Sequence, residues 1–176
     1  DLARFRKFSV APRRELLLTG NAWVDEVFRL PQRAARRESP TILFAPTHNP
    51  ETSAASVLGE SLVPLIRAVY PKSRVIIKPH PHILSVPQMD DPNLSIMRHH
   101  RPLFQQWVTT WERNAREDGN VQFVTDQSVS ITRFFEDADI LISDGSSLIL
   151  EFMALDRPML LARSREKIRH WTYDDD

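Results

Sequence analysis

The stretch that decides the fold is residues 139–147, Asp-Ile-Leu-Ile-Ser-Asp-Gly-Ser-Ser, in which a short apolar run leads directly into a small polar turn. Strands that are almost wholly apolar are typical of a parallel sheet covered on both faces. We therefore expect a buried strand over residues 139–143 and, after the turn, a helix over residues 146–155.

The same alternation of apolar strand and helix extends outward through most of the chain. Further strands are expected at residues 42–46, 74–78, 121–125 and 158–162, and further helices at 52–70, 102–117 and 131–137. Pro64 should kink or divide the helix over 52–70, and a loop should cover 79–93. The pattern predicts an α/β fold, a Rossmann-like parallel sheet with helices on both faces.

Length and composition exclude several classes of protein. The 176 residues suit one domain, or one half of a two-domain enzyme. The 23 basic and 23 acidic residues balance, which argues against a nucleic-acid-binding protein. The chain has no cysteine, which excludes disulfides and thiol catalysis. Because it begins at Asp1, we expect it to be part of a longer protein, with an entry segment over 1–40 and the domain over 41–176.

The turn that follows the strand at 139–143 is a candidate anion site, because ligands of such sheets bind beyond the carboxyl ends of the strands. Gly145 permits a tight turn, and Ser146 or Ser147 can cap the helix that follows. The free N–H groups of a first helical turn suit a pyrophosphate. Glu151, one turn further on, can accept hydrogen bonds from ribose hydroxyls. The plainer alternatives are an ordinary capped turn and a surface glutamate.

A second strand end carries Lys-Pro-His-Pro-His at residues 78–82. Lys78, His80 and His82 would form a cationic or proton-donating cluster, and the two prolines should hold the segment extended so that both imidazoles point to one side. Ordinary loop histidines are the alternative, which fits His82 better than His80. His48, after the first strand, is ambiguous. No partner set has the spacing of metal ligands, so we expect neither a metal nor another cofactor.

Several familiar signatures are missing from the sequence. With four glycines, the chain has no Gly-x-Gly-x-x-Gly fingerprint and no Gly-Lys-Ser/Thr phosphate loop. It also lacks the Gly-x-Ser-x-Gly elbow of serine hydrolases. A dehydrogenase, a nucleotide hydrolase and a serine hydrolase are therefore disfavoured.

Together these motifs resemble the CDP-glycerol glycerophosphotransferases, the enzymes of teichoic-acid and capsular polymer synthesis. The resemblance covers residues 16–162 and is carried by Thr19-Gly20-Asn21, Val24-Asp25, Phe44-Ala45-Pro46-Thr47, residues 78–82, residues 139–147, Glu151 and Asp156-Arg157-Pro158. It implies a GT-B architecture of two Rossmann-like domains facing a cleft. This chain would be the C-terminal, donor-binding half, with an N-terminal Rossmann-like domain elsewhere in the parent protein.

The resemblance also implies roles for particular residues. The catalytic candidates are His80, which would stabilise the leaving phosphate, and Lys78. The donor pyrophosphate would contact Ser146, Ser147, Gly145 and His82. The nucleotide or ribose, near the fourth and fifth strand ends, would contact Glu151, Asp144, Thr47 and His48. An acceptor hydroxyl would attack the β-phosphate of CDP-glycerol and release CMP. The general base is expected in the other domain, so the isolated chain should be inactive.

Two departures from the family pattern keep alternatives open. The family usually has Asp-Tyr-Ser-Ser where this chain has residues 144–147, and Thr-Trp-Arg where it has Thr47-His48-Asn49. The alternatives are a GT-B glycosyltransferase or epimerase that uses a UDP- or CMP-sugar, and a non-catalytic nucleotide-binding or interaction module. The expected partners of the leading hypothesis are a nucleotide-activated donor and a polymer acceptor. Its expected location is the cytoplasm, where the basic residues 1–37 would face the partner domain or the inner, anionic surface of the membrane.

Overall fold

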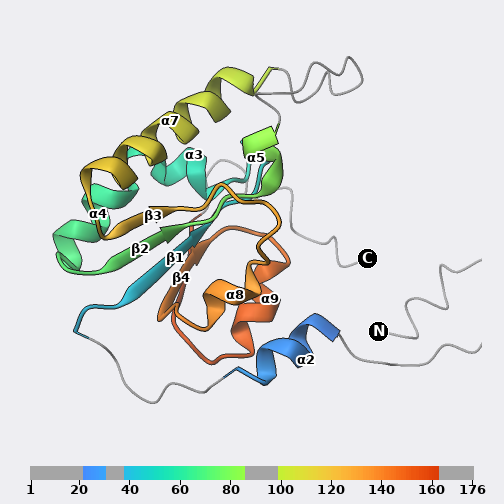
Figure 1. Cartoon of the computed structure of the whole chain (residues 1–176). Coiled ribbons are helices and arrows are strands. Elements are labelled where there is room, and N and C mark those ends of the chain that lie inside the picture. Colours follow the sequence, from blue (N-terminus) through green and yellow to red (C-terminus); the bar gives the residue numbers. More distant parts are fainter. Residues whose placement is uncertain (1–21, 31–37, 86–98, 163–176) are drawn as a thin grey trace, which may run out of the picture.

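The computed structural model describes residues 22–30, 38–85 and 99–162 (Figure 1). Most of the expected entry segment, including Thr19-Gly20-Asn21, lies outside these residues, and the boundary at residue 40 stays a prediction. The described residues contain a five-stranded sheet with the order β3-β2-β1-β4-β5. Every neighbouring pair of strands is parallel. The expected α/β fold with a Rossmann-like parallel sheet is confirmed.

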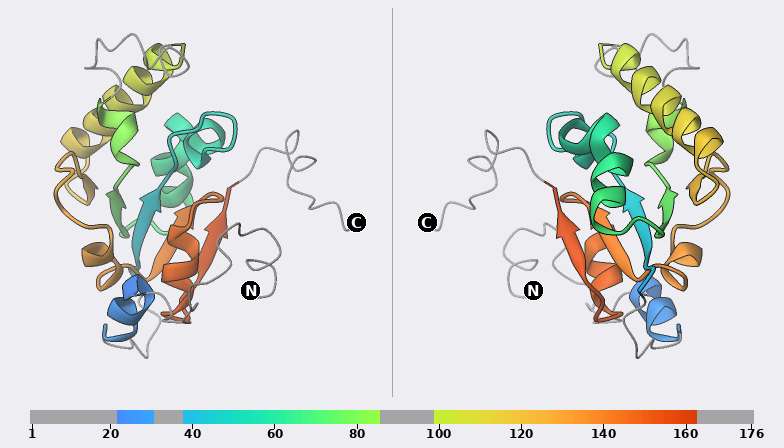
Figure 2. Two further views of the ribbon diagram at one scale, coloured as in Figure 1. Left: turned by 90° about the vertical axis from the view of Figure 1, so that its right-hand side faces the viewer. Right: turned by 90° about the vertical axis from the view of Figure 1, so that its left-hand side faces the viewer.

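All five strands lie where the apolar runs predicted them; the first is shifted by one residue, and the other four are trimmed at one or both ends. Their bounds are β1 Thr41–Ala45, β2 Arg74–Ile77, β3 Val121–Phe123, β4 Ile140–Ser143 and β5 Met159–Leu161. The central strand β1 is buried along its whole length. Its Leu43 is in register with Ile76 of β2 and Leu141 of β4. Strand β5 forms one edge of the sheet (Figure 2).

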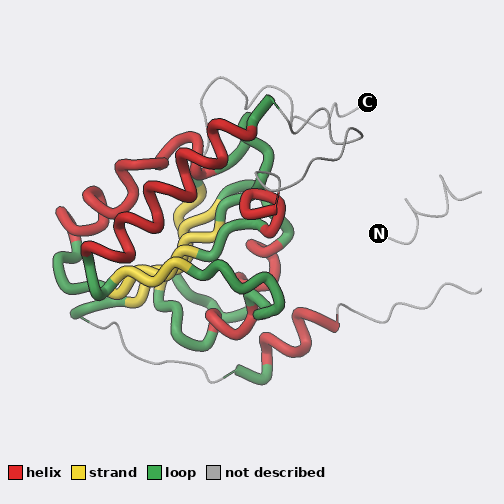
Figure 3. The backbone as a smooth tube through the Cα atoms, turned by 45° about the horizontal axis from the view of Figure 1, so that its top comes forward, coloured by secondary structure: helices red, strands yellow, loops and turns green. Residues whose placement is uncertain are grey.

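Helices cover both faces of the sheet (Figures 1 and 3). One face carries α3 (Ala54–Leu58), α4 (Leu62–Val69) and α7 (Arg101–Glu117), and the other carries α2 (Ala22–Phe28), α8 (Thr132–Phe135) and α9 (Leu148–Met153). Successive side chains of a strand point to opposite faces. Phe44 therefore packs with Trp111 in one core, while Leu43 belongs to the other core with Phe135 and Phe152.

Two local predictions were wrong. The helix expected over 52–70 is divided at Gly59, which adopts φ 35° and begins a 3₁₀ turn, Gly59–Ser61. Pro64 lies instead in the first turn of α4, where an N–H has no helical partner to lose. The loop expected over 79–93 contains a short helix, α5 (Pro81–Ser85), because Pro81 is well suited to the first position of a helix. Residues 86–98 lie outside the description.

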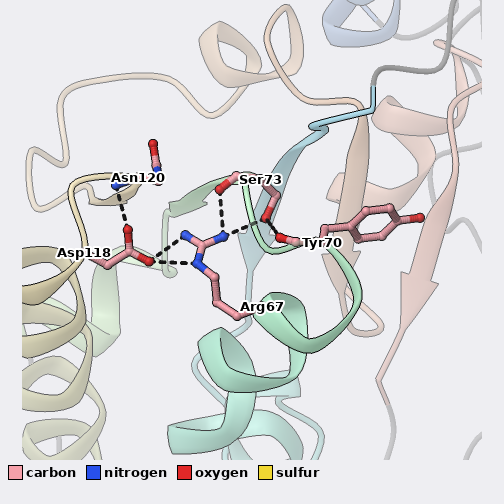
Figure 4. A network of polar contacts seen from close by, with 5 residues as sticks. All are labelled: Arg67, Tyr70, Ser73, Asp118 and Asn120. Carbon is pink, nitrogen blue, oxygen red and sulfur yellow. Dashed lines mark hydrogen bonds and ion pairs between the residues drawn. The ribbon is translucent and has the colours of Figure 1, made fainter.

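A polar network joins two turns at the amino-terminal edge of the sheet (Figure 4). The Arg67 guanidinium donates through Nε to Asp118 at 2.8 Å and through Nη1 to Ser73. A backbone hydrogen bond from Asn120 is the largest factor lowering the pKa of Asp118, and Arg67 also lowers it. The network therefore links the turn before β2 to the turn before β3, on the side away from the strand ends that bear the motifs.

Within the described ranges, no helix has the length and apolar character that a membrane crossing needs.

Candidate functional site

A cavity of about 300 Å³ lies at the carboxyl ends of β1, β2 and β4. Five of the residues expected from the sequence line it: Thr47, Lys78, His80, Ser146 and Ser147. They come from three separate strand ends, which the parallel sheet brings to one edge. The other five candidates, Gly145, His82, Glu151, Asp144 and His48, do not line this cavity.

Lys78 lines the cavity, and its ammonium group is also a structural link. The residue is 6% exposed, and its Nζ donates a hydrogen bond to the backbone carbonyl of Asp126 at 2.8 Å. Burial lowers the pKa of Lys78, and the nearby Asp126 carboxylate partly opposes that shift. Lys78 thus holds the loop between β3 and α8 against the end of β2 and contributes positive charge to the cavity wall.

Three imidazole rings gather beside the cavity. The ring of His48 lies 4.4 Å from that of His80 and 5.0 Å from that of His82, and the His80 and His82 rings are 4.9 Å apart, measured between centroids. The expected proximity of His80 and His82 is therefore found, but the expected extended backbone is wrong, because His82 lies in helix α5. His48, which the sequence left ambiguous, completes the cluster.

The cluster is less cationic than the sequence suggested. Burial, followed by the charges of His48 and His82, lowers the pKa of His80 to about 4. Burial and His82 also lower the pKa of His48, and Asp144 partly opposes this. Both imidazoles are therefore neutral near pH 7, because moving them out of water disfavours the charged form. Among the described residues that line the cavity, Lys78 is the remaining cation.

Asp144 directly follows β4 and is fully buried. Its Oδ2 accepts hydrogen bonds from the backbone N–H groups of Thr47 at 2.7 Å and Ala54 at 2.9 Å. Burial raises the pKa of Asp144, and those backbone hydrogen bonds act in the opposite direction. A ligand could reach this carboxylate only after a rearrangement. The hydrogen bonds of Asp144 therefore suit a role in holding the ends of β1 and β4 together better than the ribose contact that the resemblance implies.

The turn after β4 differs from the capped helix that the sequence predicted. Helix α9 begins at Leu148, and the Ser147 side chain makes no capping hydrogen bond. Both serines nevertheless face the cavity, and the buried Oγ of Ser146 has no hydrogen-bond partner. A buried hydroxyl without a partner is costly unless a ligand or water supplies one. The two serines therefore remain candidate ligand contacts through their side chains.

Glu151 lies outside both hollows at this end of the sheet, the cavity described above and the larger one described next. It is half-buried on α9, and burial raises its pKa. Its proposed contact with ribose stays a prediction.

The loop between β3 and α8 supplies cavity residues that sequence reasoning missed. Gln127, Val129, Ser130 and Ile131 line the same wall as Lys78 and His80. Val129 and Ser130 also line a second hollow of about 580 Å³, bounded by Glu26 and Leu30 of the α2 region together with Thr132 and Arg133. The position of this loop directly after a strand of the sheet was the one signal available, since its residue types are ordinary.

A metal centre finds no support in the parts of the chain that the structure describes. No group of three or more His, Asp or Glu side chains there has an arrangement that could hold a metal ion. The three clustered imidazoles contact one another through their rings instead.

The fold and the cavity define a Rossmann-like domain with a candidate anion site at its strand ends. The chain belongs to the CDP-glycerol:poly(glycerophosphate) glycerophosphotransferase family, whose model matches residues 11–167. The resemblance inferred from the motifs is thereby confirmed. Among solved structures, the H444N variant of the wall teichoic acid polymerase TagF is similar, with 18% identity and a TM-score of 0.43. The match covers 79% of this chain and 28% of that polymerase. No curated protein matches.

Proposed function

We propose that this chain is the donor-binding domain of a glycerophosphotransferase and that its cavity binds the diphosphate of CDP-glycerol. Membership of the family supports a transferase that uses a nucleotide-activated donor. The observation that carries the proposal is the convergence of Lys78, His80 and Ser146 on one cavity from three strand ends. An ammonium, an imidazole N–H and an unpartnered hydroxyl are the donors that phosphate oxygens accept from.

In the proposed reaction, an acceptor hydroxyl attacks the β-phosphorus of CDP-glycerol. A new phosphorus–oxygen bond to the acceptor forms, the bond from the β-phosphorus to the bridging oxygen breaks, and CMP leaves. The acceptor's proton passes to a general base in the partner domain of the parent protein. Lys78 and His80 would stabilise negative charge on the leaving phosphate, the step in which phosphoryl transfer gains most from positioned donors. The isolated chain should bind donor without turnover.

The two adjoining hollows suggest how the donor lies. The cavity of about 300 Å³ is at the small end for a complete ligand of this size. The larger hollow shares Val129 and Ser130 with it and offers an apolar floor with the charged side chains of Glu26 and Arg133 on its wall. We place the nucleoside toward this hollow, which revises the earlier expectation of the fourth and fifth strand ends. In the same proposal, the acceptor is a hydroxyl group of a polymer. The basic residues 1–37 would contact the partner domain or an anionic membrane surface.

Titration calorimetry of the 176-residue chain with CDP-glycerol, CMP, UDP and UDP-N-acetylglucosamine tests the proposal. We expect CDP-glycerol to bind most tightly. Preference for a UDP compound would instead indicate a sugar-nucleotide enzyme, and absence of binding by all four at millimolar concentration would indicate a non-catalytic module. Either result would overturn the proposed donor.

Variants test where the donor sits. His80→Ala and the double variant Ser146→Ala/Ser147→Ala should each weaken CDP-glycerol about tenfold while changing cytidine binding little, because each removes donors to the diphosphate. Arg133→Ala should show the reverse selectivity. The control is Arg113→Ala on the outer face of α7, which should change neither. Equal CDP-glycerol affinity in the wild type and the cavity variants would contradict the proposed placement.

A further inference from the structure

His80 directly precedes helix α5, and one of its two imidazole nitrogens accepts a hydrogen bond from the first turn of that helix. Its Nδ1 accepts a hydrogen bond from the backbone N–H of His82 at 3.2 Å, one residue beyond Pro81, the first residue of the helix. This is the bond that a capping side chain normally makes at a helix start. A nitrogen that accepts a hydrogen bond carries no proton, so the proton of the neutral ring lies on Nε2.

His48 lies against the ring of His80. The two ring centroids are 4.4 Å apart with planes inclined by 43°, and the Nδ1 of His48 is buried without a hydrogen-bond partner. A proton on that nitrogen would therefore be a buried, unsatisfied donor, which makes a charged His48 unfavourable. His48 thus excludes water from one side of His80 without itself supplying a stable positive charge.

We propose that His48 is a positioning residue that keeps His80 as a neutral Nε2–H donor for the diphosphate, rather than as an imidazolium. The inference rests on the proposed function for the identity of the ligand. A neutral imidazole at a helix start can polarise a phosphate oxygen without transferring a proton to it, so the leaving CMP departs in its ionised form. The donor state of His80 then does not vary with pH through the neutral range.

The charged groups around His80 are consistent with this assignment. Lys78, directly after β2, donates a hydrogen bond to the backbone carbonyl of Asp126. The Asp126 carboxylate accepts hydrogen bonds from Ser128. Asp144, directly after β4, accepts hydrogen bonds from backbone amides. Burial, His48 and His82 are the causes of the lowered pKa of His80. Among the described residues, those that shift the pKa of His80 include no carboxylate that would stabilise an imidazolium there.

Nitrogen-15 NMR of histidine-labelled 176-residue chain tests the inference, with the His80 signals assigned by their loss in His80→Gln. In the wild type we expect the Nε2–H form of His80 from pH 6 to pH 8. In His48→Ala the titration midpoint of His80 should rise by about one pH unit or more, because the burial of His80, the largest cause of its lowered pKa, is reduced. His48→Phe, which retains an aromatic ring against His80, should keep the neutral form. His99→Gln is the matched control, since His99 is an exposed histidine outside the cluster.

Calorimetry of CDP-glycerol binding at pH 7.5 in two buffers of different ionisation enthalpy completes the test. We expect no proton uptake in the wild type. Uptake of about one proton, an Nδ1–H form of the free protein, or a midpoint unchanged in His48→Ala would each overturn the inference. If His48→Ala does not fold, the wild-type spectrum and His48→Phe still decide. If CDP-glycerol fails to bind, the proposed function is contradicted while the spectra of the free protein still test the assignment.

Discussion

The carboxylate of Asp144, at the end of β4, accepts the backbone N–H of Thr47, just beyond the end of β1, at 2.7 Å. The same oxygen accepts the N–H of Ala54, at the start of α3. Thr47 in turn accepts the Ser53 hydroxyl through its carbonyl. One buried carboxylate thereby sets the path of the chain between β1 and α3, the segment that carries Thr47 into the cavity and His48 onto His80.

We predict that Asp144→Ala lowers the free energy of unfolding by about 3 kcal/mol, because the buried amide of Ala54 and the part-buried amide of Thr47 lose their acceptor. Asp144→Asn should cost less, since one amide oxygen remains to accept. Urea denaturation monitored by fluorescence measures both. The control, Asp137→Asn in the exposed pair with Arg74, should change stability by less than about 0.5 kcal/mol. An Asp144→Ala variant as stable as this control would contradict the assigned role.

The lowered pKa of His80 predicts acid sensitivity. The ordinary value of 6.5 applies to the unfolded chain and about 4 to the folded one, so the unfolded state binds more protons between these values. Stability is therefore fully present above pH 6.5 and is lost as the pH falls toward 4. For a half-buried group we expect a contribution of about 1 to 2 kcal/mol. Urea denaturation at pH 5 and pH 7.5 should show a smaller difference for His80→Gln than for the wild type, and equal differences would refute it.

Lys78→Met should loosen the loop between β3 and α8, because it removes the hydrogen bond to the Asp126 carbonyl. We expect faster amide hydrogen exchange at residues 126–130 and about tenfold weaker CDP-glycerol binding, the effect of losing one charge-assisted hydrogen bond. Hydrogen exchange with mass spectrometry and calorimetry measure the two effects. Lys72→Met, at an exposed position before β2, is the control. Unaltered exchange in the loop would show that Lys78 does not anchor it.

Arg67→Gln should destabilise the fold without affecting the ligand site. Arg67 links the turns before β2 and β3 through Asp118 and Ser73, at the edge opposite the cavity. We expect a loss of about 1 kcal/mol in the free energy of unfolding with unchanged CDP-glycerol affinity. Arg74→Gln, in a more exposed ion pair, should cost less. A clear loss of affinity in Arg67→Gln would mean that the two edges of the sheet are coupled.

Periodicity and turn chemistry determined most of the fold. Apolar runs such as Ile42–Phe44 and Val75–Ile77 could be assigned to buried parallel strands, because only such strands lack a polar face. Rossmann-like order then placed three motif-bearing strand ends at one edge. The local errors concern proline, whose preferred positions include both helix breaks and helix starts. Gly59 rather than Pro64 divides the helix, and Pro81 starts a helix instead of extending a loop.

The amino-acid sequence by itself therefore determined the fold class, the family and which three strand ends carry the polar motifs. The tertiary structure decided what those side chains can do. Burial and mutual repulsion make His80 neutral, the Thr47 and Ala54 amides occupy Asp144, and the loop of Gln127 and Ser130 forms a wall of the cavity. Charge state, hydrogen-bond occupancy and cavity shape depend on contacts between residues distant in the chain, and residue spacing does not encode those contacts.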